Sequence, residues 1–335
     1  MDLALMNFSA HSAGSLPKLQ PIIIVGASAR AAAQWAISRG HLPWCIDLFG
    51  DRDLRAIANV TVCSMDKYPE GILDCFSKAP PDAPVILTGR MENHLSIVEA
   101  IARHRRLLHS SLGAMRAARQ PALWRKALIP AIAGIASPQP TGATGEKLVS
   151  KPVASGSINM HNGGQVGEDR YLQRYVQGES ISAVYEDDRC MGASKQLVEQ
   201  FRYAGSIGPI TTTKPMRELG QRLADRLGLR GLWGVDMVRD HDGVLVPVEI
   251  NPRYCASMET VRTGRNKLVI YAKQDVTVGD LYEHFTSSEV ADVPAINTQI
   301  KAGQPVCTLL ASEADPDTAI GRLQGMADRL YTRLH

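Results

Sequence analysis

The sequence predicts an α/β protein that begins with a doubly wound domain built around a parallel sheet. Short apolar segments alternate with helical patterns in the first third of the chain, as expected for strand–helix–strand units. Further on, two apolar runs flank Asp242-Gly243, and this dipeptide predicts a β-hairpin. At 335 residues the chain is long enough for two or three domains, each with its own core.

The N-terminal elements follow one another in a regular order. The predicted elements are strands at 21–26, 44–49, 60–63 and 85–88 and helices at 29–39 and 93–104. This outline is that of a nucleotide-binding half-fold, but the turn Gly26-Ala27-Ser28 lacks the further glycines of the dinucleotide motif. A doubly wound preliminary domain is therefore favoured, and a nicotinamide-dependent enzyme remains the alternative.

Three polar residues of this domain are candidates for binding a substrate. Ser28 and Arg30 follow the first predicted strand, and Glu92 follows the fourth. In open α/β sheets, ligands collect at the carboxyl ends of the strands. The alternative is that these residues only form turns and helix caps.

The central part of the chain contains a lysine on a predicted strand, followed by a loop of small residues. The chain is predicted to be helical from residue 111 until the break at 137–140, whose sequence is Ser-Pro-Gln-Pro. The next strand, 148–152, ends in Lys151-Pro152, and Ser155 and Gly156 follow. A rigid strand can hold a lysine toward phosphate oxygens, while the backbone N–H groups of such a loop close over them.

Further strands lead to the hairpin. The predictions are a strand at 171–176, a hairpin of strands 181–185 and 191–197, a polar loop at 201–209 and a helix at 216–228. Within the loop, Arg202 is a candidate for holding an anionic substrate, with a packing role as the alternative.

The hairpin at 232–253 places three oxygen donors on one face. A two-residue turn at Asp242-Gly243 sets Asp236 opposite Glu249, and the period of two keeps Asn251 on the same face. The opposite face is predicted to be apolar and to face the core, with Val244, Val246, Val248 and Ile250. Two opposed carboxylates repel unless something neutralises them, and a divalent cation such as Mg²⁺ suits this donor set. The alternative is a solvated hairpin whose acids pair with arginines at 239 or 253.

These residues together resemble a known family. The ordered set Lys151, Glu179, Asp236, Glu249, Asn251 and Arg253 is similar to that of the ATP-grasp superfamily of carboxylate–amine ligases. The resemblance implies an ATP-grasp fold with a doubly wound N-terminal domain and a small C-terminal β appendix. It is nearest to a branch found near one-carbon cofactor pathways, which includes enzymes that join glutamate to an amine.

The resemblance also implies roles for individual residues. ATP and one or two Mg²⁺ ions, which Mn²⁺ could replace, are the expected cofactors, with Asp236, Glu249 and Asn251 as metal ligands. Arg253 and Lys151 would be catalytic. The nucleotide would be bound by Lys151, Ser155, Gly156, Gln173, Arg174, Tyr175, Val176 and Glu179, the last through the ribose hydroxyls. The lysine that the family usually carries near the start of this region is missing, and Arg119 or Lys126 could take its place.

The C-terminal part shows no chemistry of its own. We expect a turn at 254–263 that contains Glu259, a strand at 267–272, short β segments at 291–311 and a final helix at 317–334. The expected organisation is a loose lead-in at 1–20, an N-terminal α/β domain at 21–110, the ATP-grasp domain at 111–262 and the appendix at 263–335.

Composition excludes several classes of function. The net charge is only +3, and apart from Arg103–Arg106 there is no basic block, so a nucleic-acid partner is not indicated. The six scattered cysteines fit a reducing compartment, and no apolar run has the length of a membrane span. We therefore expect a cytoplasmic protein. The resemblance implies that it binds a small carboxylate and an amine, with a homodimer left open. A non-catalytic nucleotide-binding protein is the other alternative.

Overall fold

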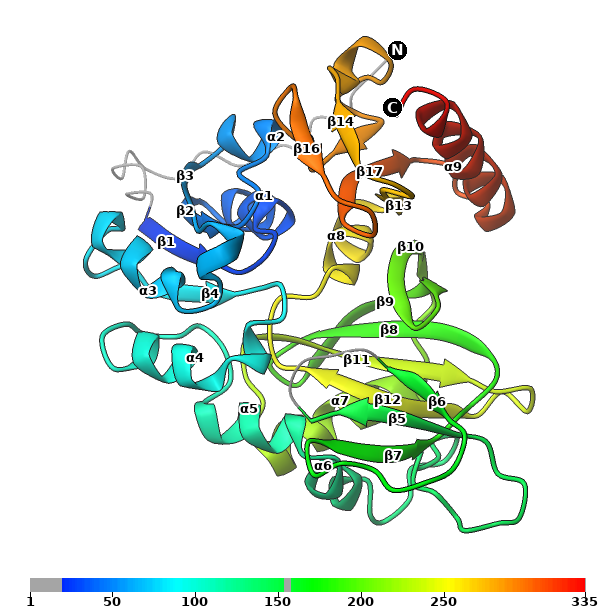
Figure 1. The fold of residues 1–335 in the computed structure, drawn as a ribbon. Coiled ribbons are helices and arrows are strands. Elements are labelled where there is room, and N and C mark those ends of the chain that lie inside the picture. Colours follow the sequence, from blue (N-terminus) through cyan, green and yellow to red (C-terminus); the bar gives the residue numbers. More distant parts are fainter. Residues whose placement is uncertain (1–19, 154–157, 335) are drawn as a thin grey trace, which may run out of the picture.

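The computed structural model describes residues 20–153 and 158–334 (Figure 1). The predicted lead-in therefore lies outside the described residues except for Gln20, and so do Ser155 and Gly156. The described part contains a parallel sheet, a long antiparallel sheet, a small three-stranded sheet and a two-stranded sheet.

The N-terminal domain is doubly wound, as predicted. Its strands are β1 (Gln20–Val25), β2 (His41–Asp47), β3 (Asn59–Val62) and β4 (Val85–Leu87), which pair in parallel in the order β3-β2-β1-β4. Its helices are α1 (Arg30–Ser38), α2 (Arg52–Arg55), α3 (Gly71–Cys75), α4 (Leu95–Ala102) and the 3₁₀ turns η1 (Met65–Lys67), η2 (Phe76–Lys78) and η3 (Met91–Asn93).

Both faces of this sheet are covered, which explains the uninterrupted apolar run of β1. Ile22 and Ile24 pack with the alanines of α1, whereas Ile23 and Val25 pack with apolar residues of α3 and α4. A strand buried on both sides carries apolar residues at successive positions and does not alternate.

A long antiparallel sheet forms the centre of the molecule, in the order β12-β11-β8-β9-β10-β13-β17-β15. Its strands are β8 (Glu179–Glu186), β9 (Arg189–Glu199), β10 (Arg202–Ile210), β11 (Leu232–Arg239), β12 (Leu245–Asn251), β13 (Asn266–Tyr271), β15 (Val290–Ala291) and β17 (Pro305–Ala311). Helices α5 (Leu112–Arg119), α6 (Pro121–Ala127) and α7 (Lys214–Leu227) cover one face and share a core cluster with it. Because β13, β15 and β17 continue this sheet, the C-terminal part is attached to it through the strand ladder.

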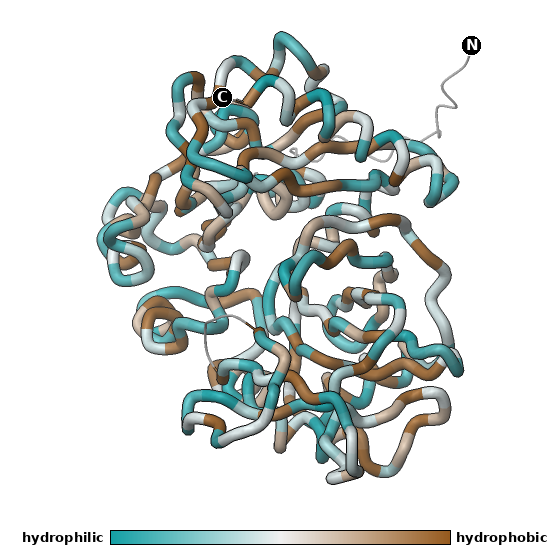
Figure 2. Tube along the Cα trace, turned by 45° about the vertical axis from the view of Figure 1, so that its right-hand side comes forward, coloured by the Kyte–Doolittle hydropathy of each residue, from teal (hydrophilic) through white to brown (hydrophobic). Residues whose placement is uncertain are grey.

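The remaining elements complete the two ends of the molecule. The small sheet has the order β6-β5-β7, formed by β5 (Leu148–Pro152), β6 (Asn159–His161) and β7 (Arg170–Arg174). The C-terminal part adds β14 (Val276–Val278), η4 (Leu281–Glu283), β16 (Thr298–Ile300) and α9 (Pro316–Tyr331), and α8 (Ser257–Thr263) connects it to the rest. Hydrophobic and hydrophilic segments alternate along the chain throughout (Figure 2).

Three predictions of secondary structure are wrong. Residues 202–210 form strand β10 and not a loop, and 257–263 form helix α8 and not a turn. The predicted helical region of 111–136 ends at Ala127, and residues 128–147 contain no helix. Pro130 and Gly134 interrupt this last segment, whereas β10 was hidden by its polar and glycine-rich composition.

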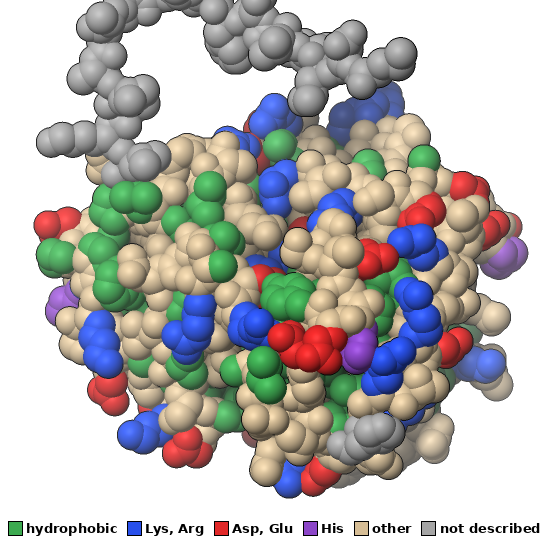
Figure 3. All heavy atoms as spheres, turned by 90° about the horizontal axis from the view of Figure 1, so that it is seen from above, with side chains coloured by type: hydrophobic (Ala, Val, Ile, Leu, Met, Phe, Trp, Pro, Cys, Tyr) green, Lys and Arg blue, Asp and Glu red, His purple; other side chains and the backbone are tan. Residues whose placement is uncertain are grey.

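None of the helices in the described residues is long and apolar enough to cross a membrane. The face seen in Figure 3 carries acidic and basic side chains side by side, without a large block of one sign.

Candidate active site

The predicted opposition of Asp236 and Glu249 on the β11–β12 hairpin is confirmed. The pairing that produces it differs from the prediction at two points. Arg239 pairs with Leu245, so the turn is one residue off the predicted register, and a bulge between Asp236 and Met237 restores the expected pairs beyond it.

The same bulge corrects the prediction of the apolar face. Of the four residues predicted to form it, only Ile250 belongs to the core cluster beneath the sheet. Leu245 joins that cluster, while Val244, Val246 and Val248 do not. One extra residue in a strand reverses the alternation of side chains between the two faces. The face predicted by counting from the turn is therefore wrong for the residues between the turn and the bulge.

The predicted metal-ligand side chains lie together and accept hydrogen bonds from nitrogen donors. Both oxygens of Asp236 accept hydrogen bonds at 2.9 Å, Oδ1 from Gln196 and Oδ2 from the Asn251 amide. The Glu249 Oε1 atom accepts from Arg119 Nη1, also at 2.9 Å. Gln196 was not predicted from the sequence, because nothing in its own strand separates it from an ordinary surface glutamine.

Lys151 lies against this hairpin, as its predicted role requires. Its side chain is buried on β5, and the Nζ atom donates to the backbone oxygen of Val248 at 2.8 Å. Burial lowers the pKa of Lys151, although the charges of Glu249 and Asp236 act in the opposite direction.

The two acids respond differently to this environment. Burial and the nearby charge of Glu249 raise the pKa of Asp236 to about 6. Burial also opposes the ionisation of Glu249, but Lys151 and Arg119 outweigh it and lower the pKa of that carboxyl. Because these two cations hold Glu249 ionised, the like-charge repulsion falls on Asp236.

Arg253 connects this group to the N-terminal domain. Its Nε atom donates to Glu92 Oε2 at 2.7 Å, and its Nη2 atom donates to Asn251 Oδ1 at 3.1 Å. Glu92 is 2% exposed and comes from η3, directly after β4. Burial alone would lower the pKa of Arg253, but the charge of Glu92 raises it above its ordinary value.

A comparison with known proteins identifies this part of the chain. Residues 126–257, which include β5 and both strands of the hairpin, match the family model described as an ATP-grasp domain. Residues 126–257 form an ATP-grasp domain. The complete fold, with its parallel N-terminal sheet and antiparallel central sheet, is likewise the ATP-grasp fold.

Solved structures share this fold at low sequence identity. An N5-carboxyaminoimidazole synthetase of Staphylococcus aureus complexed with ADP matches with a TM-score of 0.64 and 13% identity, covering 93% of this chain and 99% of that one. An L-amino acid ligase of Bacillus licheniformis matches with a TM-score of 0.61 and 13% identity, covering 92% and 97%.

One curated relative matches part of the chain. It is an uncharacterised protein of Methanocaldococcus jannaschii, which is 24% identical over 165 residues. The matched stretch spans 42% of this chain and 42% of that relative, which is less than half of either protein.

The predicted adenine and ribose region lies at the entrance to strand β8 of the ATP-grasp domain. Residues 175–178 connect the small sheet to the central sheet, where a hinge segment was predicted. The backbone N–H groups of Arg174 and Tyr175 donate to Pro138 and Lys147, at 2.9 and 2.8 Å, so these two donors are already used. Gln173 is buried on β7, and the side-chain Oε1 atom has no hydrogen-bond partner among the described residues. Val176 lies in the connecting segment, and Glu179 begins β8.

Glu179 forms two ion pairs in this structure. Lys195 Nζ lies 2.5 Å from Oε1, and Arg239 Nη1 lies 3.1 Å from Oε2. A ribose diol would therefore compete with two cations for this carboxylate. The predicted role of Glu179 stays a prediction.

Three of the predicted substrate residues lie apart from the hairpin contacts. Ser28 is exposed at the β1–α1 turn. Arg30 is 2% exposed and binds Glu259 and Asp292, which places its charge at the junction with the C-terminal part. Arg202 contacts the C-terminal part through Gly303 and the Tyr271 ring. Only Glu92 reaches the site, through Arg253.

Arg119 and Lys126, on the neighbouring helices α5 and α6, are the two candidates to replace the missing lysine. Arg119 reaches Glu249, whereas Lys126 is exposed on α6. Arg125, directly before Lys126, is a further residue that the sequence did not identify. The guanidinium of Arg125 lies 5.7 Å from the Trp124 ring centre and 5.9 Å from that of Tyr171. Nothing in the sequence Trp-Arg-Lys separates the two basic residues, because the orientation of α6 decides which of them is buried.

The acidic residue that ends β2 has a structural role. Asp47 is 1% exposed and accepts backbone hydrogen bonds from Ala29, Phe49 and Gly50. In a dinucleotide-binding half-fold the corresponding acid would bind a ribose. Its oxygens hold two loops here, which weighs against the nicotinamide alternative.

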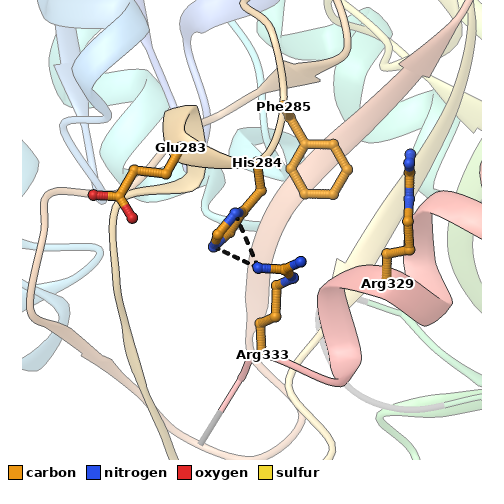
Figure 4. Close-up of a pocket in the computed structure, with 5 residues that line it drawn as sticks. All are labelled: Glu283, His284, Phe285, Arg329 and Arg333. Atoms are coloured by element: carbon orange, nitrogen blue, oxygen red, sulfur yellow. Dashed lines mark hydrogen bonds between the residues drawn. The ribbon is translucent and has the colours of Figure 1, made fainter.

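A small cavity lies far along the chain from these residues. It has a volume of about 190 Å³ and is lined by Glu283, His284, Phe285, Arg329 and Arg333 (Figure 4). Small-molecule sites usually measure ~300–1,000 Å³, so this cavity is too small to be a substrate site on volume alone.

Among the described residues there is also no group of three or more His, Cys, Asp or Glu that could hold a metal ion. A metal site here would therefore have to include an amide, as the predicted set does.

Proposed function

We propose that the protein is an ATP- and Mg²⁺-dependent ligase that activates a carboxylate as an acyl phosphate and joins it to an amine. The observation that supports this most is the convergence of opposite charges on one hairpin of the ATP-grasp domain. Asp236 and Glu249 lie opposite each other, with Lys151 and Arg253 held against the same hairpin.

The donor set fits a divalent cation. Asp236 and Glu249 offer hard, anionic oxygens. Burial and then the charge of Glu249 raise the pKa of Asp236, and a bound cation would favour its ionised form against both. Asn251 presents its N–H₂ to Asp236 and its oxygen to Arg253, and a rotation of the amide exchanges the two. Mg²⁺, or Mn²⁺ in its place, would neutralise the charge of the nucleotide phosphates when bound.

The chain's own residues would position the reacting groups. Lys151 is fixed on a strand, so its ammonium group can neutralise phosphate oxygens without a further loss of side-chain freedom. Arg253 is held by Glu92, and its remaining donors would steady the phosphoryl group as it passes to the substrate carboxylate. The amine then displaces phosphate from the acyl phosphate and forms an amide.

The comparisons support the same proposal. The similar solved structures include an L-amino acid ligase and a synthetase complexed with ADP. A cytoplasmic location is part of the proposal, because all six cysteines are free thiols. A small-molecule carboxylate and an amine are the proposed partners, and a homodimer remains open.

Titration calorimetry with Mg·ATP tests the site itself. We expect the wild-type protein to bind Mg·ATP and Glu249→Gln to bind it at least 10-fold more weakly, since one anionic ligand is lost. Glu218→Gln is the matched control, because Glu218 is exposed on α7 and its substitution should leave affinity unchanged. Equal affinity of wild type and Glu249→Gln would contradict the assignment of the hairpin.

ADP release then separates a ligase from a non-catalytic nucleotide-binding protein. The screen covers pairs of carboxylates and amines, with glutamate and aromatic amines among them. A ligase should release ADP when the carboxylate and the amine are both present. If the acyl phosphate forms before the amine binds, the carboxylate alone should also cause ADP release. Tight Mg·ATP binding with no ADP release across a broad screen would favour the non-catalytic alternative.

A further inference from the structure

Arg125 is a partly buried residue, and two of its three guanidinium nitrogen atoms are shielded from solvent. Its Nε and Nη2 atoms are both buried, and neither has a hydrogen-bond partner among the residues that the structure describes. Its guanidinium lies near two aromatic rings, those of Trp124 on its own helix and Tyr171 on β7. One edge of the guanidinium is left unsatisfied among the described residues.

This arrangement is costly for the protein alone. A guanidinium edge that is shielded from water and has no partner destabilises a fold, and buried arginines are therefore almost always paired. Burial accordingly lowers the pKa of Arg125. An uncharged side chain would pack at this position at less cost, so the unsatisfied edge points to an anion that completes the site.

The position of Arg125 identifies the kind of anion. Tyr171 pairs with Lys151 across the β5–β7 ladder, so Arg125 borders the strand that carries the proposed phosphate-binding lysine. Arg125, Arg119 and Lys151 are near enough to one another that both arginines disfavour the charged form of the lysine. Three cations therefore gather beside two carboxylates, Glu249 and Asp236, and an anion would balance the remaining positive charge.

The unsatisfied edge has the shape of a phosphate ligand. The Nε and Nη2 hydrogens lie along one side of the guanidinium plane and can bind two oxygens of one group at the same time. We propose that Arg125 binds phosphate oxygens of the nucleotide through this edge, beside Lys151. The inference rests on the proposed function, because it requires that ATP binds at this hairpin.

The test compares Arg125→Gln with Arg116→Gln in the full chain. Arg116 lies on α5, is half-exposed and pairs with Glu99 at the surface, so its substitution removes the same charge without touching the site. By calorimetry with Mg·ATP we expect ~10- to 100-fold weaker binding for Arg125→Gln, the usual effect of losing a charged hydrogen-bonding pair. Arg116→Gln should bind as wild type does, and adenosine should bind all three proteins equally.

Thermal unfolding without ligand provides a second readout. If Arg125 serves the ligand, Arg125→Gln should be as stable as wild type or more so, because a partly buried charge with an unsatisfied edge is gone. A structural role for Arg125 predicts a loss of stability instead, and that loss would overturn the proposal. Arg125→Lys keeps the charge but not the two-pronged edge, so it should recover only part of the ATP affinity.

The outcomes separate this proposal from the general function. If wild-type protein binds Mg·ATP and Arg125→Gln binds it equally well, the role of Arg125 is wrong and the ligase proposal stands. If wild-type protein does not bind Mg·ATP, both are wrong. If adenosine affinity falls together with ATP affinity, the side chain shapes the pocket and does not bind phosphate.

Discussion

Replacing Glu259 by glutamine should destabilise the protein, because it removes the charge that holds two buried cations. Arg30 donates to its carboxylate at 2.6 and 3.0 Å and Lys267 at 3.1 Å, and all three residues are at most 5% exposed. Breaking a buried ion pair from one side costs ~3–5 kcal/mol, since the remaining charge stays buried. Arg30 keeps Asp292 at 2.8 Å, so we expect the lower end, about 3 kcal/mol.

Urea unfolding followed by tryptophan fluorescence and circular dichroism measures this cost. The matched control is Asp275→Asn, which breaks the 2.7 Å ion pair between Asp275 and Lys301. The Lys301 side chain is 70% exposed and that of Asp275 is 60% exposed. A surface pair of this kind contributes ~0–1 kcal/mol, so the control should unfold nearly as wild type does. An unfolding free energy of Glu259→Gln within about 0.5 kcal/mol of wild type would refute the reasoning. An equal loss in both variants would refute it as well.

The pH dependence offers a second check of the same group. Burial opposes ionisation of Glu259, but the charges of Arg30 and Lys267 outweigh it and hold the pKa of this carboxyl well below its ordinary value. The unfolded chain protonates this group near pH ~4.3, so its stabilising contribution is present above that pH and is lost as pH falls through the lower folded pKa. Glu259→Gln lacks this contribution, and its stability should decline less steeply in acid.

Four further substitutions test other parts of the structure. Burial, followed by neighbouring carboxylates, raises the pKa of Asp51 to about 8, so the folded state holds a proton that the unfolded state has released, and stability should fall as pH rises from ~4 to 8. Asp51→Asn should flatten that limb of a pH series of urea unfolding curves. Glu92→Gln should lower the rate of ADP release ~10- to 100-fold while Mg·ATP affinity changes little, because the arginine that it positions acts on the transferring group; a matching loss of affinity would contradict this. Gly220→Ala should destabilise by ~1–3 kcal/mol, since the added Cβ would lie 2.1 Å from the Tyr185 ring, whereas Gly321→Ala, with open space around it, should stabilise by ~0.5–1 kcal/mol in thermal unfolding.

The sequence was sufficient for the parts of the fold that depend on local patterns. The β1 strand and the helix after it follow from an apolar run and a turn, and the hairpin of β11 and β12 follows from Asp242-Gly243. Residues 202–210 were missed because their strand pairs on both sides with distant segments, and those partners supply the stabilisation that polar and glycine residues lack. The bulge that reverses the apolar face lies beside Pro247, which cannot donate a ladder hydrogen bond and is the one local signal of an irregularity there.

The same division applies to the candidate site. Asp236, Glu249 and Asn251 were predicted because a period of two and one turn place them together. Arg119 and Arg125 could not be assigned in this way, because the contacts that distinguish them from other surface arginines come from strands more than 40 residues away. Arg30 shows the opposite case, since its position at a strand end predicted a ligand and its contacts show a buried ion pair instead.

The contacts of Glu92 and Arg30 together explain how the N-terminal domain can influence an ATP-grasp site that it does not contain. Glu92 binds Arg253, at the end of the hairpin, and Arg30 binds Glu259, six residues further along the chain. The segment between them is therefore held at both ends by side chains of the N-terminal domain, and it leaves the hairpin directly after Asn251. Movement of that domain would shift Arg253 and Asn251 relative to Lys151, which lies on a separate sheet. Because positioning dominates phosphoryl transfer, the ion pairs between the domains would contribute to the proposed reaction by holding Arg253 and Asn251 in place.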